Sequence, residues 1–499
     1  MDVLPTPEQM MLDIPVAGRI QDTSAFKDVR RLNDYLFMQH TFDGSHGYKD
    51  CSYLVPNDRE TFYDTRRRSS YYINVFKPIL NAMVDPCFNG DISRETNNDM
   101  MVEFIQNCDN SGTDLSTFMK AAIKNARLYS INFIVMDNFK SEEISAAETT
   151  ADAIEDRKFP YIYERPPQSI KEYHCDEFGK MIDVTFFDKE EHVKGADDNI
   201  ECRSHYRYWD TMNWRAFYTV AGKNTDEGKA IEITTGEGVH GLGKLPVIAF
   251  IDFSKSANLS ELPSPEMYDL AFLCFALFNK ESHVVQMELY QTFSILCTSG
   301  LGKSAISLGV STLLDSGTES KYPPTYVSPS QEGIKVLVEN CTRLKEEIQA
   351  EAQQKGVIGV KSSKSGVATQ WDFRAEEAVL RQTSVACMRV ENAIAELFGI
   401  YLGTKIAYEV KYPLTFSPVA DGDELTRIMA LLDKMPPKEI ELELWKRVVE
   451  IQFKGNQEKI EEIKDSVDVS AEQSTAINAM KIADDAEAAV APGVEKEIE

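Results

Sequence analysis

The sequence predicts a mainly helical α+β fold in which long helices flank an insert that is rich in strands. Hydrophobic residues recur at helical spacing over roughly 265–292, 331–354 and 372–398, which predicts three long helices. Between residues 160 and 252, short segments rich in β-branched and aromatic residues predict strands. The chain has 499 residues, of which 43% are hydrophobic, so its length and composition suffice for about two to four domains.

The N-terminal region is predicted to combine a turn-rich stretch, helices and one buried strand. Residues 1–60 are mixed in character and contain turn-like segments such as FDGSHGYKD. Residues 114–139 predict a helix that leads into a buried strand, INFIVMD. The acidic segment 140–158 has few large hydrophobic residues and is predicted to be a mobile surface excursion. Between residues 60 and 114, helical spacing predicts a helix along the hydrophobic positions Tyr72, Val75, Phe76, Ile79, Leu80 and Met83.

The insert over 160–252 is predicted to consist of strands and hairpins. Its segments are short and are bounded by Gly, Asp or Asn, which is typical of strands separated by turns. The predicted strands are YIYERPP, MIDVTFFD, SHYRYWD, WRAFYTVAG, AIEITTG and LPVIAFID.

The second half of the chain is organised around the three long helices. Pro263 and Pro265 suit the entry of the first helix, and a module rich in Gly, Ser and Pro follows over 293–330. The second helix is predicted to bury Ile334, Leu337, Val338, Cys341, Leu344 and Ile348. A glycine–serine loop, GVIGVKSSKSG, separates it from the third helix, which is predicted to bury Leu380, Thr383, Cys387, Val390, Ile394 and Leu397.

The C-terminal region is predicted to be helical and acidic. After a predicted strand, YPLTFSPV, come two helical patterns, GDELTRIMALLDKM and PKEIELELWKRVVEIQF, separated by two prolines. Beyond Gly455 acidic residues predominate and alanine is frequent, so this tail is predicted to be a frayed helix that ends in disorder.

The charge balance and the cysteines limit the classes of function. Eighty acidic and 53 basic residues give a net charge of −27, which disfavours a protein whose main work is to grip nucleic-acid phosphates. Nine cysteines lack paired spacing, as expected of reduced thiols. The first residues lack the features of a secretory signal, and the longest hydrophobic run, MYDLAFLCFALF, is too short to span a membrane. We therefore expect a soluble protein that acts in the cytoplasm and has no membrane partner.

The segment CTSGLGKS is the one candidate for a catalytic phosphate site. A phosphate-binding loop has Gly-x-x-x-x-Gly-Lys-Ser/Thr between a strand and a helix, and Cys297 occupies the position of the first glycine. A nucleotide-driven motor also needs a carboxylate after a buried strand, and the only matches, Asp137 and Asp252, lie upstream, the reverse of the usual order. The pattern favours a connection of small residues, and a P-loop-type ATPase that uses Lys303 and Ser304 is the alternative.

Two short segments have metal-like spacing, His174-Cys175 and Cys202-x-x-His205. Adjacent side chains on a strand point to opposite faces, so the first pair is not expected to bind one ion together. A structural zinc site needs four convergent Cys or His ligands, and at most three could converge here. We therefore predict no metal and no cofactor.

No other motif predicts catalysis. The segments SGVAT and TSGLG lack the Gly-x-Ser-x-Gly spacing of a nucleophile elbow, and carboxylates are too frequent for any pair to be distinctive. The basic patch Arg66-Arg67-Arg68 favours a solvated helix start over a contact with a nucleic acid or an acidic neighbour. We therefore predict no catalytic residue and expect that the protein is not an enzyme.

The order of the elements resembles that of tailed-bacteriophage portal proteins, the head-to-tail connectors. Two long helices joined through a compact module suit a stem with a small head, and lateral packing in a ring would bury their surfaces. The resemblance covers roughly residues 60–440. The segments that carry it are RRRSSYYINVFKPILNAMVDPCF, LPSPEMYDLAFLCFALFNKESHVVQMELYQTF, SPSQEGIKVLVENCTRLKEEIQAEAQQKGVIGV and SKSGVATQWDFRAEEAVLRQTSVACMRVENAIAELFGIYLG.

This resemblance implies a portal-like subunit with the following parts. Residues 1–264 would form a wing with the β-rich insert, and 413–499 would form the crown and the acidic tail. Between them would lie a first stem helix (265–292), a clip (293–330), a second stem helix (331–354), a tunnel loop (355–371) and a long helix at the junction of wing and crown (372–412).

The resemblance also implies a role and partners. A portal is a dodecameric ring at one capsid vertex of the virion, assembled in the host cytoplasm, and serves as the channel for DNA packaging and ejection. Its partners would be the terminase large subunit, adaptor or neck proteins, the major capsid protein or scaffold, and double-stranded DNA that passes without sequence specificity. Another virion head component, such as an adaptor or minor head protein, is the third alternative.

A channel for a dense polyanion should not bind it tightly, and the charge agrees with that role. Twelve chains would carry on the order of −300, which opposes adhesion of DNA over short distances. The resemblance places Lys361 and Lys364 in the tunnel loop, where they would make brief, non-specific phosphate contacts. The channel-lining residues would be Lys361, Ser362, Ser363, Lys364, Ser365 and Gly366.

Overall fold

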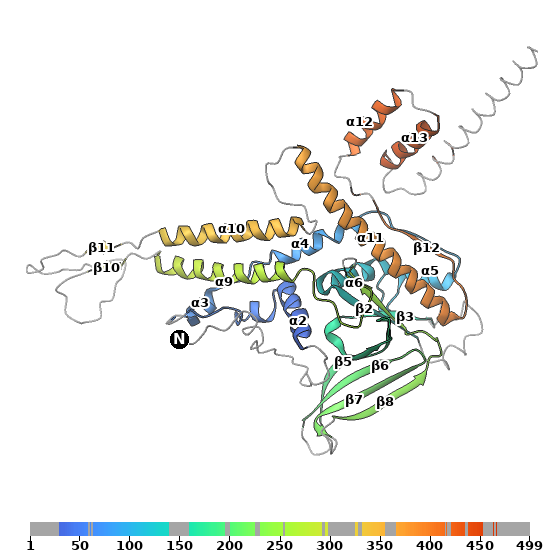
Figure 1. The fold of residues 1–499 in the computed structure, drawn as a ribbon, viewed down its shortest axis with the longest axis horizontal. Coiled ribbons are helices and arrows are strands. Elements are labelled where there is room, and N and C mark those ends of the chain that lie inside the picture. Colours follow the sequence, from blue (N-terminus) through green and yellow to red (C-terminus); the bar gives the residue numbers. More distant parts are fainter. Residues whose placement is uncertain are drawn as a thin grey trace, which may run out of the picture. The chain divides into compact units, whose positions relative to one another are not determined.

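A computed structural model gives the fold of the chain (Figure 1). It describes residues 29–57, 60, 63–138, 159–194, 200–224, 230–252, 255–291, 295–297, 325–327, 332–354, 366–414, 416, 421–434, 438–452, 463 and 466. The chain divides into two compact units, Met1–Thr415 and Phe416–Glu499. Helices predominate among the described residues, and the described strands lie in the first unit. The predicted mainly helical α+β fold is therefore confirmed.

The first unit begins with short helices that pack around one core. They are α2 (Val29–Asp43), α3 (Tyr63–Ser69), α4 (Phe76–Ala82), α5 (Asp99–Gln106) and α6 (Leu115–Tyr129), with the 3₁₀ turns η2 (His46–Tyr48) and η3 (Asp85–Phe88). The first helix, α2, lies in the stretch for which the sequence predicted turns, and that prediction was incomplete. Asn98 and Asp114 cap α5 and α6, each accepting a hydrogen bond from a backbone amide of the first turn.

The single helix predicted along residues 72–83 was wrong in its extent. The chain leaves α3 at Ser69, runs without regular structure through Val75, and begins α4 at Phe76. Pro78 explains the restart, because its ring excludes the carbonyl group four residues earlier and it has no amide hydrogen to donate. Proline is tolerated only in the first turn of a helix, which is where α4 places it.

A three-stranded antiparallel sheet lies beside these helices. Strand β2 (Ile131–Asp137) is its centre, with β3 (Tyr161–Arg165) on one side and β9 (Val247–Ile251) on the other. Six of the seven residues of β2 are buried, in agreement with the predicted buried strand. Ser130 connects α6 to β2 in the left-handed conformation, at φ 65°. The predicted surface excursion, 140–158, lies outside the described residues.

A five-stranded antiparallel sheet makes up most of the insert (Figure 1). Its strands follow one another in chain order: β4 (Ile170–Cys175), β5 (Met181–Lys194), β6 (Ile200–Trp209), β7 (Asn213–Asn224) and β8 (Ala230–Val239). All six predicted strands are present in the two sheets. Strand β4 and the turn before it, η4 (Pro167–Ser169), were not predicted.

The three long helices are present close to their predicted positions. They are α9 (Tyr268–Gln291), α10 (Glu332–Gln354) and α11 (Gly366–Leu402). Helix α11 begins six residues earlier than the predicted start at Asp372, so the predicted tunnel loop 355–371 was too long. Residues 367–370 have side chains that are compatible with a helix. Gly366, which suggested a loop, is the first residue of the helix.

A short strand, β12 (Tyr408–Lys411), follows α11 and pairs antiparallel with β1 (Ser93–Thr96). This pairing joins residues that are more than 300 positions apart in the sequence. The strand ends at Lys411, so the described residues 412–414 and 416 of the predicted strand YPLTFSPV are not part of it, and residues 415 and 417–419 lie outside the described residues. Pro413 has no amide hydrogen for a ladder, which accounts for the end of the strand two residues before it.

The second unit contains two described helices, α12 (Asp421–Leu432) and α13 (Lys438–Gln452), which pack against each other. Both were predicted from their hydrophobic spacing. Of the predicted acidic tail beyond Gly455, only residues 463 and 466 are described.

Candidate functional site at the paired helices

Helices α9 and α10 lie side by side and run in opposite directions (Figure 1). At a rise of about 1.5 Å per residue, each is roughly 35 Å long. Both helices bury hydrophobic residues, among them Cys274, Leu277, Phe278 and Val284 on α9 and Cys341, Leu344, Ile348 and Ala352 on α10. On α9, Phe278 packs against Tyr48 and Tyr72 of the body of the first unit. An ion pair of 2.7 Å between Lys345 Nζ and Glu281 Oε1 links the two helices.

Helix α9 is fixed to the body of the first unit through Arg66. The Arg66 side chain is fully buried, and its guanidinium donates to Glu60 Oε2 at 2.7 Å, to Ser282 Oγ at 2.9 Å and to Val55 O at 2.7 Å. Asn279 adds a second link, since it accepts a hydrogen bond from the Val55 amide. The solvated helix start predicted for the basic patch was therefore wrong for Arg66.

The pair Arg66–Glu60 is an ionic contact shielded from water. Hydrogen bonds from Arg66 are the main reason that the pKa of Glu60 falls from 4.5 to about 2. The neighbouring Arg67 and Arg68 are exposed, and Arg67 donates to the carbonyl oxygen of Asp50. Only one arginine of the three is thus part of the attachment of α9.

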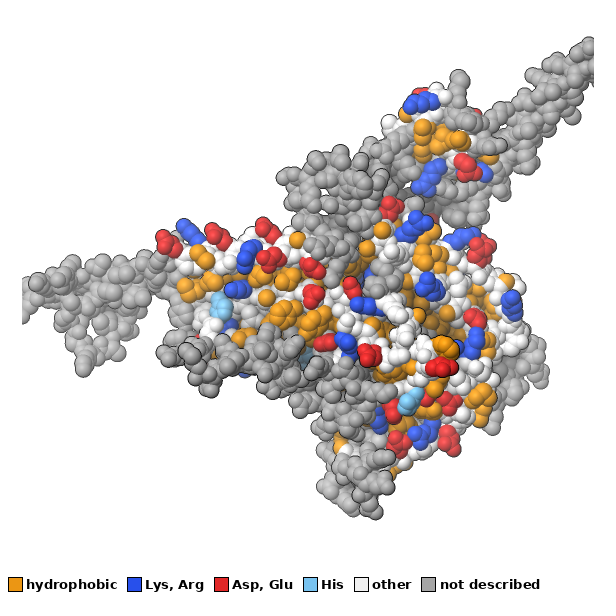
Figure 2. Space-filling model, viewed as in Figure 1, with side chains coloured by type: hydrophobic (Ala, Val, Ile, Leu, Met, Phe, Trp, Pro, Cys, Tyr) orange, Lys and Arg blue, Asp and Glu red, His pale blue; other side chains and the backbone are white. Residues whose placement is uncertain are grey.

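Within the part of the chain that the structure describes, helix α10 is packed mainly on one side. Among the described elements its extensive packing is with α9, and most of its other residues are exposed. Acidic and basic side chains are interspersed with hydrophobic ones along the face seen in Figure 2. Val336 and Val338 are 55% and 44% exposed, so Val338 does not belong to the buried seam as predicted. The predicted positions Cys341, Leu344 and Ile348 are buried.

The far ends of the two helices are joined by a narrow antiparallel ribbon. Strand β10 (Ile295–Cys297) pairs with β11 (Thr325–Val327), with Ile295 opposite Val327 and Cys297 opposite Thr325. The rest of the predicted clip, 293–330, lies outside the described residues, as do Lys303 and Ser304.

The candidate phosphate loop follows strand β10, which ends at Cys297 and pairs with β11 in an antiparallel ribbon. Residues 298–304 of the loop lie outside the described residues. Of the two candidate carboxylates, Asp137 ends β2 and Asp252 follows β9, so the antiparallel pairing places them at opposite ends of the two paired strands. Each is held by an arginine, Asp137 by Arg207 at 2.8 Å and Asp252 by Arg127 at 3.2 Å.

The predicted channel residues 361–365 lie outside the described residues, and Gly366 is the first residue of α11. Helix α10 ends at Gln354, so residues 355–365 connect the two helices. The predicted buried positions along α11 are confirmed: Leu380, Thr383, Cys387, Val390, Ile394 and Leu397 are all less than 7% exposed.

Two buried polar networks fix α11 and were not predicted from the sequence. Glu391, 1% exposed, accepts hydrogen bonds from Arg94 at 2.7 and 3.1 Å and from the hydroxyl groups of Tyr408 and Tyr412. Thr383 accepts a hydrogen bond of 2.7 Å from Arg127, the arginine that also binds Asp252. Each network joins α11 to elements far away in the sequence, which a pattern read along one segment does not reveal.

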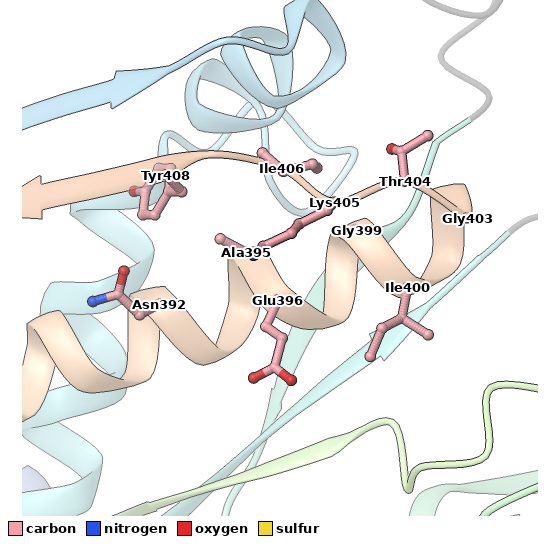
Figure 3. Close-up of a pocket in the computed structure, with 10 residues that line it drawn as sticks. All are labelled: Asn392, Ala395, Glu396, Gly399, Ile400, Gly403, Thr404, Lys405, Ile406 and Tyr408. Atoms are coloured by element: carbon pink, nitrogen blue, oxygen red, sulfur yellow. The ribbon is translucent and has the colours of Figure 1, made fainter.

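A pocket of about 490 Å³ lies where α11 ends and the chain turns into β12 (Figure 3). Gly399 on its wall has no room for a side chain, because a Cβ atom there would lie 2.7 Å from the carbonyl oxygen of Thr404. Gly403 ends the helix at φ +66°, a conformation that favours glycine. Glu396, one of the lining residues, forms an ion pair with Lys244. The lining is Asn392, Ala395, Glu396, Gly399, Ile400, Gly403, Thr404, Lys405, Ile406 and Tyr408.

The four residues with metal-like spacing do not converge. His174 contacts Asp183 Oδ1 at 2.8 Å, and Cys175 donates to the carbonyl oxygen of Leu259. His205 lies 3.0 Å from Glu191, while Cys202 donates to Glu190. This agrees with the expectation that His174 and Cys175 do not share one ion.

None of the described helices is long and hydrophobic enough to cross a membrane. No protein-family model matches the sequence, and no curated protein matches it.

Solved structures to which the chain is similar come from gene transfer agent (GTA) particles. A chain of the virion of the native particle is 14% identical, with a TM-score of 0.37, and the match covers 82% of this chain and 98% of that chain. A chain of the neck of the empty particle, computed with C6 symmetry, is 15% identical, with a TM-score of 0.37 and coverages of 76% and 90%. A chain of the native neck, computed with C12 symmetry, is 15% identical, with a TM-score of 0.36 and coverages of 71% and 84%.

Proposed function

We propose that the chain is the subunit of a portal, a ring-shaped channel at one vertex of a virion capsid. In this proposal α9 and α10 form the stem, and the module between them forms a clip that docks terminase and adaptor or neck proteins. Residues 355–365 form a tunnel loop, and double-stranded DNA passes through the ring during packaging and ejection. The subunit has no catalytic role of its own.

The observation that carries the proposal is the one-sided packing of α10. Among the described elements, α10, a helix of 23 residues, packs extensively against α9, and most of its remaining described residues are exposed. In a closed ring, each pair of helices packs against the pair of the next subunit and covers that surface. The exposed Val336 and Val338 lie on this helix, where such a contact would bury them.

The attachment of α9 supports the same role. A stem must transmit force between the channel and the surrounding body. Arg66 and Asn279 each form a hydrogen bond with the backbone of Val55, which attaches α9 to that segment of the body. The charge of −27 per chain is suited to a wall along which DNA slides, because it opposes adhesion of the polyanion.

Replacing both Val336 and Val338 by glutamate tests the proposed lateral contact. Both side chains are exposed in the single chain, so we expect the double variant to fold with an unchanged circular dichroism spectrum and to remain monomeric at micromolar concentration. Val102, which is 41% exposed on α5, provides the matched control, and Val102→Glu is expected to assemble as the unmodified protein does. Rings formed by the double variant at the same yield would remove α10 from the interface.

A further inference from the structure

A sulfur, a nitrogen and an oxygen donor meet on one face of the β5–β6 hairpin, far along the chain from the paired helices. Glu190 and His192 are two positions apart on β5, so their side chains project from the same face. The register pairs His192 with Cys202 of β6, which brings the thiol to that same face. The sequence analysis considered Cys202 with His205 instead, but His205 pairs with Lys189 and lies on the other face.

The distances between the donor atoms fit a single small ion. Cys202 Sγ lies 2.6 Å from Glu190 Oε1, His192 Nε2 lies 3.8 Å from the same oxygen, and the three donor atoms lie within 4.8 Å of one another. In a tetrahedral zinc site the ligand atoms are separated by about 3.3–3.8 Å, given metal–ligand bonds of about 2.0–2.3 Å. The Glu190 side chain is 46% exposed, so a change of its rotamer would lengthen the shortest contact.

We propose that Glu190, His192 and Cys202 bind a divalent transition-metal ion of the zinc type. Thiolate, imidazole and carboxylate together are a ligand set for zinc, whereas calcium and magnesium are bound by oxygen atoms alone. Three protein ligands leave the fourth position open to water or to a group from another molecule. The side chains of His192 and Glu190 are 66% and 46% exposed, so an ion can reach the site from solvent.

Binding exchanges a proton for the metal. Without the ion, Cys202 is a thiol that donates to Glu190, and that carboxylate raises the pKa of the thiol. On binding, a metal–sulfur bond forms, the S–H bond breaks, and the proton leaves to solvent.

Cobalt(II) binding to the full-length protein tests the proposal, because a thiolate ligand gives Co²⁺ an intense near-ultraviolet charge-transfer band. We expect a band that saturates at one ion per chain, is displaced by Zn²⁺, and is lost in Cys202→Ser. His192→Ala and Glu190→Gln should each weaken binding about tenfold or more. The matched control is the double variant His174→Ala/Cys175→Ser, which alters another histidine and the second cysteine of this sheet and should leave the band unchanged.

Two results would overturn the proposal. One is the absence of a band with the unmodified protein at millimolar Co²⁺. The other is a band that persists in Cys202→Ser, which would assign the metal to one of the other eight cysteines of the chain.

Discussion

The buried pair Arg66–Glu60 allows a sharp prediction about how the helix pair is attached. Replacing Arg66 by methionine keeps much of the side-chain volume but removes the guanidinium that binds Glu60, Ser282 and Val55. The carboxylate of Glu60, whose side chain is 6% exposed, then remains in a site that no longer compensates its charge. We expect α3 and the adjoining part of α9 to open more readily.

Two lines of reasoning give the magnitude. Removing one partner of a buried ion pair costs about 3–5 kcal/mol. Independently, the fall in the pKa of Glu60 from 4.5 to about 2 corresponds to about 3 kcal/mol of stabilisation by linkage. Because the folded-state pKa is the lower one, this stabilisation is present above about pH 4.5 and is lost as the pH falls towards 2. The difference between the variant and the unmodified protein should therefore be largest at neutral pH.

Hydrogen exchange followed by mass spectrometry measures this opening locally, without requiring two-state unfolding of a large chain. For peptides that cover α3 and α9, a loss of about 3 kcal/mol predicts exchange roughly 100-fold faster at pH 7. Arg67→Met is the matched control, since Arg67 is exposed, and it should change the opening free energy by only about 0.5 kcal/mol. Exchange in Arg66→Met within about threefold of the unmodified protein would refute the reasoning.

Three further predictions concern the loop and α11. Lys361→Glu together with Lys364→Glu should impair DNA packaging while ring assembly stays intact, as measured by packaged DNA per particle; normal packaging would show that neither lysine matters. Gly399→Ala should lower the melting temperature by an amount equivalent to about 1–3 kcal/mol, because the new methyl group meets a backbone carbonyl oxygen at 2.7 Å; an unchanged melting temperature would contradict this. Glu391→Gln should destabilise the chain by about 3–5 kcal/mol, because the buried charge of Arg94 loses its partner; a loss below about 1 kcal/mol in thermal unfolding would show that the network is not needed.

The regular elements could largely be predicted from the sequence, because they depend on local periodicity. The hydrophobic spacing along α9, α10 and α11 identified the three long helices, and alternating β-branched and aromatic residues identified six strands. The predicted helix boundaries were wrong where a proline or a glycine was interpreted without regard to its position in the helix. Pro78 restarts a helix that the spacing alone would continue, and Gly366 begins a helix although it was assigned to a loop.

The contacts that fix these elements could not be predicted in the same way. In the sequence, Arg66 is one of three consecutive arginines and is expected at the surface. Its burial follows from the packing of α9 against α3, which the sequence pattern does not indicate. Glu391 lies nearly 300 positions from Arg94, and its burial becomes clear only when β1 and β12 pair. The group Glu190, His192 and Cys202 likewise depends on the register of two strands, which the sequence does not state.

Electron microscopy of the purified full-length protein tests the central claim most directly. The portal proposal predicts end-on views of closed rings with a central hole, and twelve subunits in each ring. A uniformly monomeric protein at micromolar concentration, without rings at any salt concentration, would contradict the proposal.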